Sequence, residues 1–90
     1  MRIVAVCGMG IGTSILLKMS AEKVLKQLGI EATVEAADMT TARALGFEAN
    51  IVLTTPELVD SLKGLPAEII PIMHFFDHEE LTKKLSAALL

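Results

Sequence analysis

The sequence has no tryptophan and no tyrosine, and phenylalanine occurs only three times among its 90 residues. Aliphatic side chains must therefore fill the interior, and with 52% hydrophobic residues there are enough of them to do so. A chain of this length forms a small domain with a modest core. No linker, internal repeat or low-complexity tract divides it, so we expect one domain over residues 1–90.

Basic residues are also scarce. Eight Lys and Arg stand against eleven Asp and Glu, which gives a formal net charge of −3. Binding to nucleic acid without sequence preference needs a basic face, and attraction to anionic lipid needs a basic cluster. We therefore expect no nucleic-acid partner.

Long apolar runs are missing as well. The longest are a few residues, far short of the roughly 20 that cross a bilayer, so we expect no membrane insertion, although a partner could be a membrane protein. The single cysteine, Cys7, cannot form an internal disulfide or a Cys-only metal site. No metal or cofactor is predicted. Without a hydrophobic signal region, the chain is expected to be cytoplasmic, with its thiol reduced.

Four segments have the pattern of strands. Residues 3–6 and 51–53 are continuous apolar runs, typical of strands buried on both faces. Residues 30–37 alternate apolar and polar side chains, as a half-exposed edge strand does. Residues 68–72 include Pro71, which cannot donate to a ladder, so this strand too belongs at an edge.

The first helix should span residues 13–28. Its apolar residues fall on one face, at Leu17, Ala21, Val24 and Leu28. Glu22 and Lys26 are spaced to form an ion pair on another face, and Gly29 is a natural stop.

Three further helices have recognisable starts. Asp38 should cap a short helix that runs to residue 45, and Thr54 or Thr55 should cap a helix with Pro56 in its first turn, ending near residue 64. Asp77 opens the last helix in a pattern like a capping box. The buried stripe of this helix is expected at Leu81, Leu85, Ala88 and Leu89.

Strands and helices thus alternate, which predicts an α/β fold with a four-stranded parallel sheet and helices on both faces. The buried strands belong in the centre and the other two at the edges, and right-handed crossovers then favour the order 2-1-3-4. The topological switch point lies between strands 1 and 3, and ligands bind there, outside the carboxyl ends of the strands. Cys7 directly follows the first strand and therefore lies at the expected binding position.

A glycine-rich loop follows this cysteine. Gly8, Gly10 and Gly12 leave backbone amides open to an anion, and the next helix adds unpaired N–H groups and the positive end of its dipole. Thr13 and Ser14 would add their hydroxyls as secondary donors. The predicted cradle for a phosphate or other tetrahedral anion is formed by Gly8, Met9, Gly10, Ile11, Gly12, Thr13 and Ser14.

Met9 and Ile11 stand between glycines. We expect their side chains to be exposed at the loop tip, where they would offer an apolar contact to partner proteins. His74 and His78 flank the start of the last helix at the same end of the sheet, and we interpret them as solvated loop and cap residues. Thr54 and Thr55 border the same crevice, and helix capping explains them.

Other phosphate-binding loops fit less well. From Gly8 the chain reads Gly-Met-Gly-Ile-Gly-Thr, which breaks the dinucleotide spacing, and Gly12 stands where a Walker A loop needs lysine. A cysteine phosphatase loop, C-x5-R, needs arginine where this chain has Thr13. A nucleotide-binding module and a phosphatase are therefore disfavoured alternatives.

The thiol at the head of the loop distinguishes this site. Amides and a helix N-terminus should lower its pKa from the usual value of about 8.5. The thiolate of Cys7 could then attack phosphorus, and without an arginine the group would be hydrolysed poorly, which suits a carrier. A buried structural cysteine and a redox-sensing thiol module are the alternatives, the latter weakened because the chain has no second cysteine.

The segment VAVCGMGIGTS, residues 4–14, and the chain length resemble the IIB components of the sugar phosphotransferase system. The ascorbate-type branch is most similar and the galactitol-type next, with the resemblance strongest in residues 3–30 and 51–62. It implies the Rossmann-like or flavodoxin-like IIB fold and a phosphotransferase activity. A phosphohistidine on a IIA protein would donate to Cys7, and the phosphocysteine would donate to an ascorbate-like sugar bound by the membrane IIC component.

Overall fold

A computed structural model of the protein describes residues 1–8, 11–74 and 77–90. Its centre is a four-stranded parallel sheet in the order β2-β1-β3-β4. The α/β class and the order predicted from the sequence are thus confirmed. The strands are β1 (Arg2–Val6), β2 (Thr33–Ala37), β3 (Ile51–Thr54) and β4 (Glu68–Pro71).

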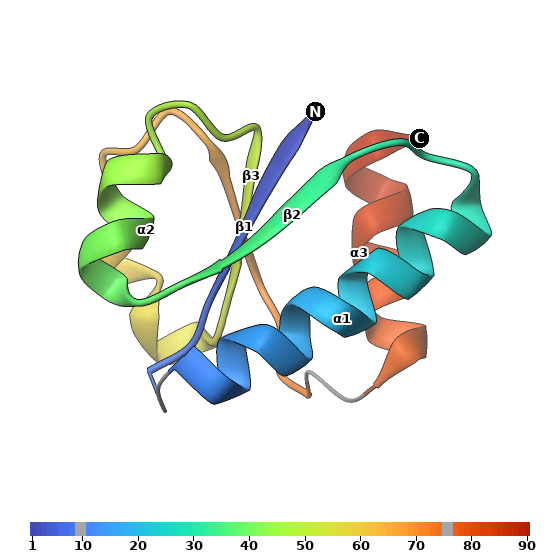
Figure 1. Ribbon diagram of the computed structural model, residues 1–90, viewed down its shortest axis with the longest axis horizontal. Helices are drawn as coiled ribbons and strands as arrows, with labels where there is room; N and C mark the ends of the chain where they lie inside the picture. The colour runs from blue at the N-terminus through green and yellow to red at the C-terminus, as the bar shows by residue number, and fades with distance from the viewer. Residues whose placement is uncertain (9–10, 75–76) are drawn as a thin grey trace.

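Helices cover both faces of the sheet. In Figure 1, α1 (Ile11–Leu28) and α3 (His78–Leu89) lie together on one side, and α2 (Met39–Leu45) lies on the other. The two short 3-10 turns η1 (Pro56–Leu58) and η2 (Asp60–Leu62) join β3 to β4. The carboxyl ends of the strands all point to the end of the molecule opposite both chain termini (Figure 1).

The two layers give two hydrophobic clusters, because successive side chains of a strand point to opposite faces. The α1/α3 cluster contains Ile3, Ala5, Cys7 and Leu53 together with buried residues of both helices. The α2 cluster contains Val4, Val6, Val52 and Leu62. The central strands β1 and β3 are therefore buried on both faces, as their apolar runs predict.

Helix α1 begins two residues earlier than expected and ends as predicted at Gly29, whose φ of 73° suits glycine. The predicted pairing of Glu22 with Lys26 is wrong. Glu22 pairs instead with Lys18, one turn earlier, at 3.5 Å. Lys26 lies in the last turn, where the negative end of the helix dipole stabilises a positive charge.

The helix predicted to follow a cap at Thr54 or Thr55 and to end near Gly64 is also wrong, because η1 and η2 replace it. The bonds there are short-range, as from Leu58 N–H to Thr55 C=O at 3.1 Å, and Thr55 makes no side-chain cap. Asp60 and Ser61 compete with the backbone for hydrogen bonds and so weaken a regular helix in this segment.

The other predicted caps form. Asp38 accepts a hydrogen bond from Thr41 N–H at 2.7 Å. Asp77 accepts from Glu79 N–H and Glu80 N–H at 3.0 and 3.4 Å. The reciprocal half of the expected capping box is wrong, since the Glu80 carboxylate accepts from Met73 N–H and His74 N–H instead.

No helix in the described part of the chain combines the length and the apolar character needed to cross a membrane.

Candidate functional site

Cys7 lies at the carboxyl end of β1, between the neighbouring strands β2 and β3. It continues the alternation of Ile3 and Ala5, so its side chain enters the α1/α3 cluster, and the residue is 4% exposed. The one thiol of the chain therefore lies at the switch point of the sheet.

Ser14, in the first turns of α1, holds the backbone beside this thiol. Its hydroxyl accepts a hydrogen bond from Cys7 N–H at 3.0 Å and donates one to Ala37 C=O at 3.2 Å. The side chain is fully buried. One hydroxyl thus connects the ends of β1 and β2 to α1.

The surroundings of Cys7 raise its pKa. Burial is the largest cause, and the negative charge of Glu57 adds to it, while a hydrogen bond with the Ser14 side chain acts in the opposite direction. The prediction of a lowered pKa is therefore wrong. The thiol packs among apolar side chains, where the charged form is poorly solvated, so it is protonated at neutral pH.

The described parts of the predicted cradle follow Cys7 in the chain and include the first turn of α1. Gly8 is exposed, and a β-carbon built there would lie 3.5 Å from Leu58, so the backbone runs beside η1. Gly12 is exposed, and nothing lies within 4 Å of where its β-carbon would be. Thr13 is half-buried. Met9, Gly10 and the side chain of Ile11 lie outside the described residues, and so does the apolar contact predicted for Met9 and Ile11.

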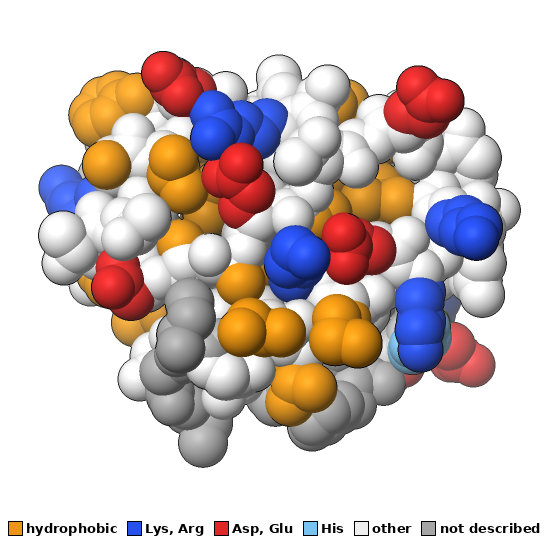
Figure 2. Space-filling view, viewed as in Figure 1, with side chains coloured by type: hydrophobic (Ala, Val, Ile, Leu, Met, Phe, Trp, Pro, Cys, Tyr) orange, Lys and Arg blue, Asp and Glu red, His pale blue; other side chains and the backbone are white. Residues whose placement is uncertain are grey.

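A different group of apolar side chains is exposed on α1. Ile15, Leu16 and Met19 are 45%, 43% and 50% exposed. Figure 2 shows hydrophobic side chains gathered over this helix. We call these three residues the α1 patch. It lies on the same helix as Ser14, near the end of the sheet where Cys7 lies.

Thr54 and Thr55 follow the centre of β3 at the same end of the sheet. Both Oγ1 atoms are buried, and neither has a hydrogen-bond partner within residues 1–8, 11–74 and 77–90. The interpretation that one of them caps a helix is wrong, because Thr55 precedes η1 without a side-chain bond. The sequence pattern predicts helix capping for these hydroxyls and does not indicate their buried environment. Aligning the two central apolar runs, residues 3–6 and 51–53, as parallel neighbouring strands could have placed Thr55 beside Cys7.

His74 and His78 are both exposed, at the loop before α3 and at its first residue. His74, Asp77 and Glu80 lie close enough together to hold a cation. Both carboxylates already have structural roles, however, because Asp77 caps α3 and Glu80 binds two loop amides. This cluster organises the start of α3.

The pKa of Glu80 reflects this role. Burial alone would raise it, but hydrogen bonds from Lys84, Met73 N–H and His74 N–H lower it to about 2. Lys84 Nζ lies 2.7 Å from the Glu80 carboxylate. The ionised carboxylate therefore fixes the backbone at Met73 and His74 relative to the first turn of α3.

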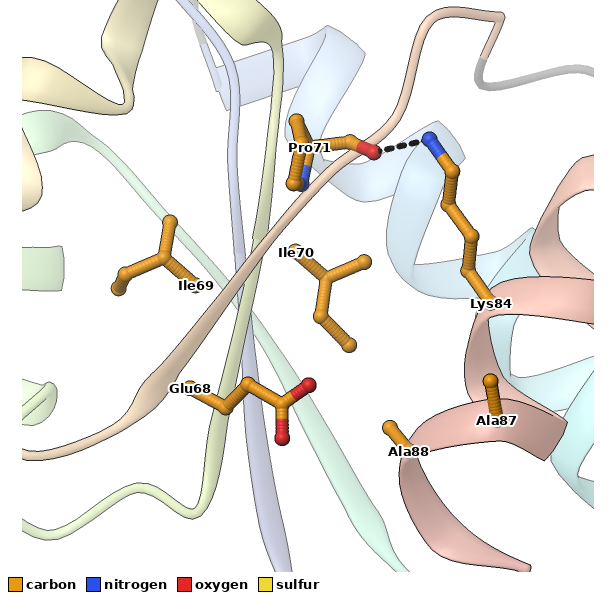
Figure 3. Close-up of a pocket in the computed structure, with 7 residues that line it drawn as sticks. All are labelled: Glu68, Ile69, Ile70, Pro71, Lys84, Ala87 and Ala88. Atoms are coloured by element: carbon orange, nitrogen blue, oxygen red, sulfur yellow. Dashed lines mark hydrogen bonds between the residues drawn. The ribbon is translucent and has the colours of Figure 1, made fainter.

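A groove of about 320 Å³ lies between the outer edge of β4 and α3. Figure 3 shows Ile70 on the side toward α3 and Ile69 on the opposite side of the strand, with Lys84 donating to Pro71 C=O. Pro71 has no N–H to offer, and its carbonyl is occupied, so these residues protect the sheet edge. Among the predicted phosphate-site residues that the structure describes, none lines this groove.

Comparisons with known proteins agree on one family. Residues 2–87 match the family described as "PTS system, Lactose/Cellobiose specific IIB subunit". The chain is 33% identical over 90 residues to the "Ascorbate-specific PTS system EIIB component" of Mycoplasma pneumoniae (strain ATCC 29342 / M129 / Subtype 1), covering 99% of this chain and 95% of that protein.

The fold has a counterpart among solved structures. The lactose-specific IIB component domain of the phosphoenolpyruvate:carbohydrate phosphotransferase system from Streptococcus pneumoniae superposes with a TM-score of 0.61. The match covers 99% of this chain and 90% of that one at 16% sequence identity. At this identity the similarity concerns the fold alone.

Proposed function

The chain belongs to the IIB family of the sugar phosphotransferase system, and on this basis we propose that Cys7 carries the phosphoryl group between a IIA protein and a sugar. The observation that carries the proposal is the position of Cys7, the one thiol of the chain, at the switch point and ahead of α1. Nucleophiles and bound anions favour this position in parallel α/β sheets.

In the first step, Cys7 Sγ attacks the phosphorus of a phosphohistidine on the IIA protein. The S–P bond forms while the P–N bond breaks, and the electron pair of the P–N bond stays on the imidazole nitrogen. The thiol proton passes to this nitrogen. Burial raises the pKa of Cys7, so the thiol holds its proton before the attack, and the leaving imidazole nitrogen is the group that accepts it.

The loop of residues 8–14 binds the transferred group in this proposal. Its backbone N–H groups, from Gly8 through Met9, Gly10, Ile11, Gly12 and Thr13 to Ser14, donate to the phosphoryl oxygens, and α1 adds its positive end. The Thr13 hydroxyl is a secondary donor. The Ser14 hydroxyl already accepts from Cys7 N–H and donates to Ala37 C=O, so its contribution is to hold Cys7 in place.

In the second step, a hydroxyl oxygen of the sugar, bound by a membrane IIC component, attacks the same phosphorus. The O–P bond forms, the S–P bond breaks, and the sulfur regains both its electron pair and a proton from the hydroxyl. We propose an ascorbate-like sugar. The support is the 33% identity, over 99% of this chain, to a protein whose name specifies ascorbate.

Both protein partners meet the chain on the cytoplasmic side of the membrane in this proposal. The exposed α1 patch supports a protein contact near Cys7, because apolar side chains grouped on a surface favour association.

The test starts with the pure protein, phosphoenolpyruvate, the general phosphotransferase proteins and an ascorbate-type IIA. An intact mass should show one added phosphoryl group, and peptide mapping should place it on Cys7. Cys7→Ser is the matched control and should gain nothing, while its fold stays intact. A galactitol-type IIA assayed in parallel tests the neighbouring branch. The proposal fails if the wild-type protein gains no phosphoryl group while the same partners load a control IIB.

A further inference from the structure

Thr55 lies beside Cys7 at the end of the neighbouring strand. β1 and β3 pair in parallel with Val6 opposite Thr54, so the next residues in register are Cys7 and Thr55. Thr55 is extended, with φ −86° and ψ 155°, and therefore continues the direction of β3 by one residue. Adjacent parallel strands lie about 4.8 Å apart, which makes these two residues lateral neighbours.

The side chains of Cys7 and Thr55 leave the sheet on the same face. Leu53 packs in the α1/α3 cluster that also contains Cys7, whereas Val52 packs in the α2 cluster. Alternation along the extended segment then places Thr54 with Val52 and Thr55 with Leu53. The two adjacent threonines thus point to opposite sides of the sheet, and only Thr55 shares the side of the thiol.

The hydroxyl of Thr55 has no hydrogen-bond partner within the described residues, although its oxygen is buried. A buried hydroxyl without a partner is unfavourable and calls for an explanation. The hydroxyl does not cap η1. On the other side of Cys7, by contrast, the Ser14 hydroxyl bonds to Cys7 N–H and Ala37 C=O.

We propose that the Thr55 hydroxyl donates a hydrogen bond to an oxygen of the phosphoryl group on Cys7, an inference that rests on the function proposed above. A phosphoryl group places three strong acceptor oxygens beyond the sulfur. A neighbouring hydroxyl on the same face is within reach of such an oxygen. Ser14 therefore positions the cysteine from the β2 side, and Thr55 binds the transferred group from the β3 side.

The chain offers a matched control, because Thr54 and Thr55 differ in the side they face. Thr55→Val removes one hydroxyl on the side of Cys7, and Thr54→Val removes one on the other side. Thr55→Ser keeps the hydroxyl. Each variant is loaded from the phosphorylated IIA protein, and the rate of phosphocysteine formation is followed by intact mass over a range of IIA concentrations.

A hydrogen bond to a charged oxygen predicts that Thr55→Val slows loading at saturating IIA by about tenfold to a hundredfold. The IIA concentration for half-maximal rate should not change, because Thr55 does not contact IIA in this proposal. Thr55→Ser should recover most of the rate, and Thr54→Val should match the wild type. The phosphorus NMR resonance of the phosphocysteine should shift in Thr55→Val and stay in place in Thr54→Val.

Two results distinguish a wrong role for Thr55 from a wrong carrier function. Wild-type loading with an unchanged phosphorus resonance in Thr55→Val overturns the role of Thr55 and leaves the carrier function standing. No loading of the wild-type protein overturns the carrier function itself. Thr55→Ala provides a second variant without the hydroxyl should the valine variant fold poorly, and a wild-type rate in a folded Thr55→Ala protein overturns the proposal equally.

Discussion

The hydroxyl of Ser14 lies 3.0 Å from the backbone nitrogen of Cys7, and it accepts a hydrogen bond from that N–H. The same hydroxyl donates to Ala37 C=O at the end of β2. A single buried side chain therefore fixes the cysteine relative to both the helix and the sheet edge. These two hydrogen bonds hold the backbone of Cys7 in place when the thiol reacts in the proposed function.

Ser14→Ala should weaken the fold and change the thiol. It leaves Cys7 N–H and Ala37 C=O without the hydroxyl, which predicts a loss of about 1–3 kcal/mol in the free energy of unfolding. It also removes the hydrogen bond that lowers the pKa of Cys7, so that pKa should rise further. Urea unfolding and ultraviolet titration of the thiolate measure the two effects. Ser20→Ala, in the middle of α1, is the control and should change neither. If the thiol titrates at the same pH in Ser14→Ala as in the wild type, the Ser14 hydroxyl does not affect the pKa of Cys7.

The raised pKa of Cys7 predicts a dependence of stability on alkaline pH. The folded state holds the thiol proton more tightly than the unfolded state, so this contribution is fully present below the ordinary cysteine pKa of about 8.5 and is lost as pH rises through the folded value. The free energy of unfolding of the wild type should therefore fall more steeply at alkaline pH than that of Cys7→Ala, which lacks the group. Parallel curves for the two proteins would mean that the thiol has the same pKa in both states.

Thr54→Val should stabilise the protein. The Thr54 hydroxyl is buried without a partner in the described part of the chain, and valine has nearly the same shape without the polar group. Removing the unsatisfied hydroxyl predicts a gain of about 1 kcal/mol in urea unfolding, with phosphoryl transfer unchanged. A clear loss of stability would instead reveal a hydrogen bond to this oxygen.

The arrangement of the sheet could be predicted from local patterns. The apolar runs at 3–6 and 51–53 mark the central strands, and Pro71 marks an edge, which together fix the strand order. The segment after β3 could not be predicted in the same way. Pro56 resembles a helix start, but Asp60 and Ser61 are poor helix residues, and short-range turns formed instead.

The position of Cys7 could be predicted, but its environment could not. The loop motif identifies the residue, whereas burial of the thiol depends on α1 and on the face that alternation assigns to it. From the motif, the pKa of Cys7 is expected to be lowered because the amides of the loop stabilise a thiolate. The apolar cluster around the thiol has the larger effect and raises the pKa. The same count along β3 places the Thr55 side chain on the side of the thiol. The sequence pattern around Thr55 indicates helix capping, and this interpretation does not place Thr55 beside Cys7.

The Glu80 carboxylate should make the start of α3 sensitive to acid. Its folded pKa of about 2 lies below the usual value, so its stabilising contribution is present above the unfolded pKa and is lost as pH falls from about 5 toward 2. Glu80→Gln keeps the size of the side chain but loses the charge that accepts from Met73 N–H, His74 N–H and Lys84. We expect Glu80→Gln to lower the free energy of unfolding by about 2 kcal/mol at neutral pH, on the scale of hydrogen bonds to a charged group.

The control is Glu79→Gln, at the exposed neighbouring residue, which should lower the free energy of unfolding much less. Urea unfolding at several pH values checks both variants, and the difference between Glu80→Gln and the wild type should shrink in acid. A difference that stays constant down to the lowest pH would mean that the charge of Glu80 does not hold the backbone of Met73 and His74.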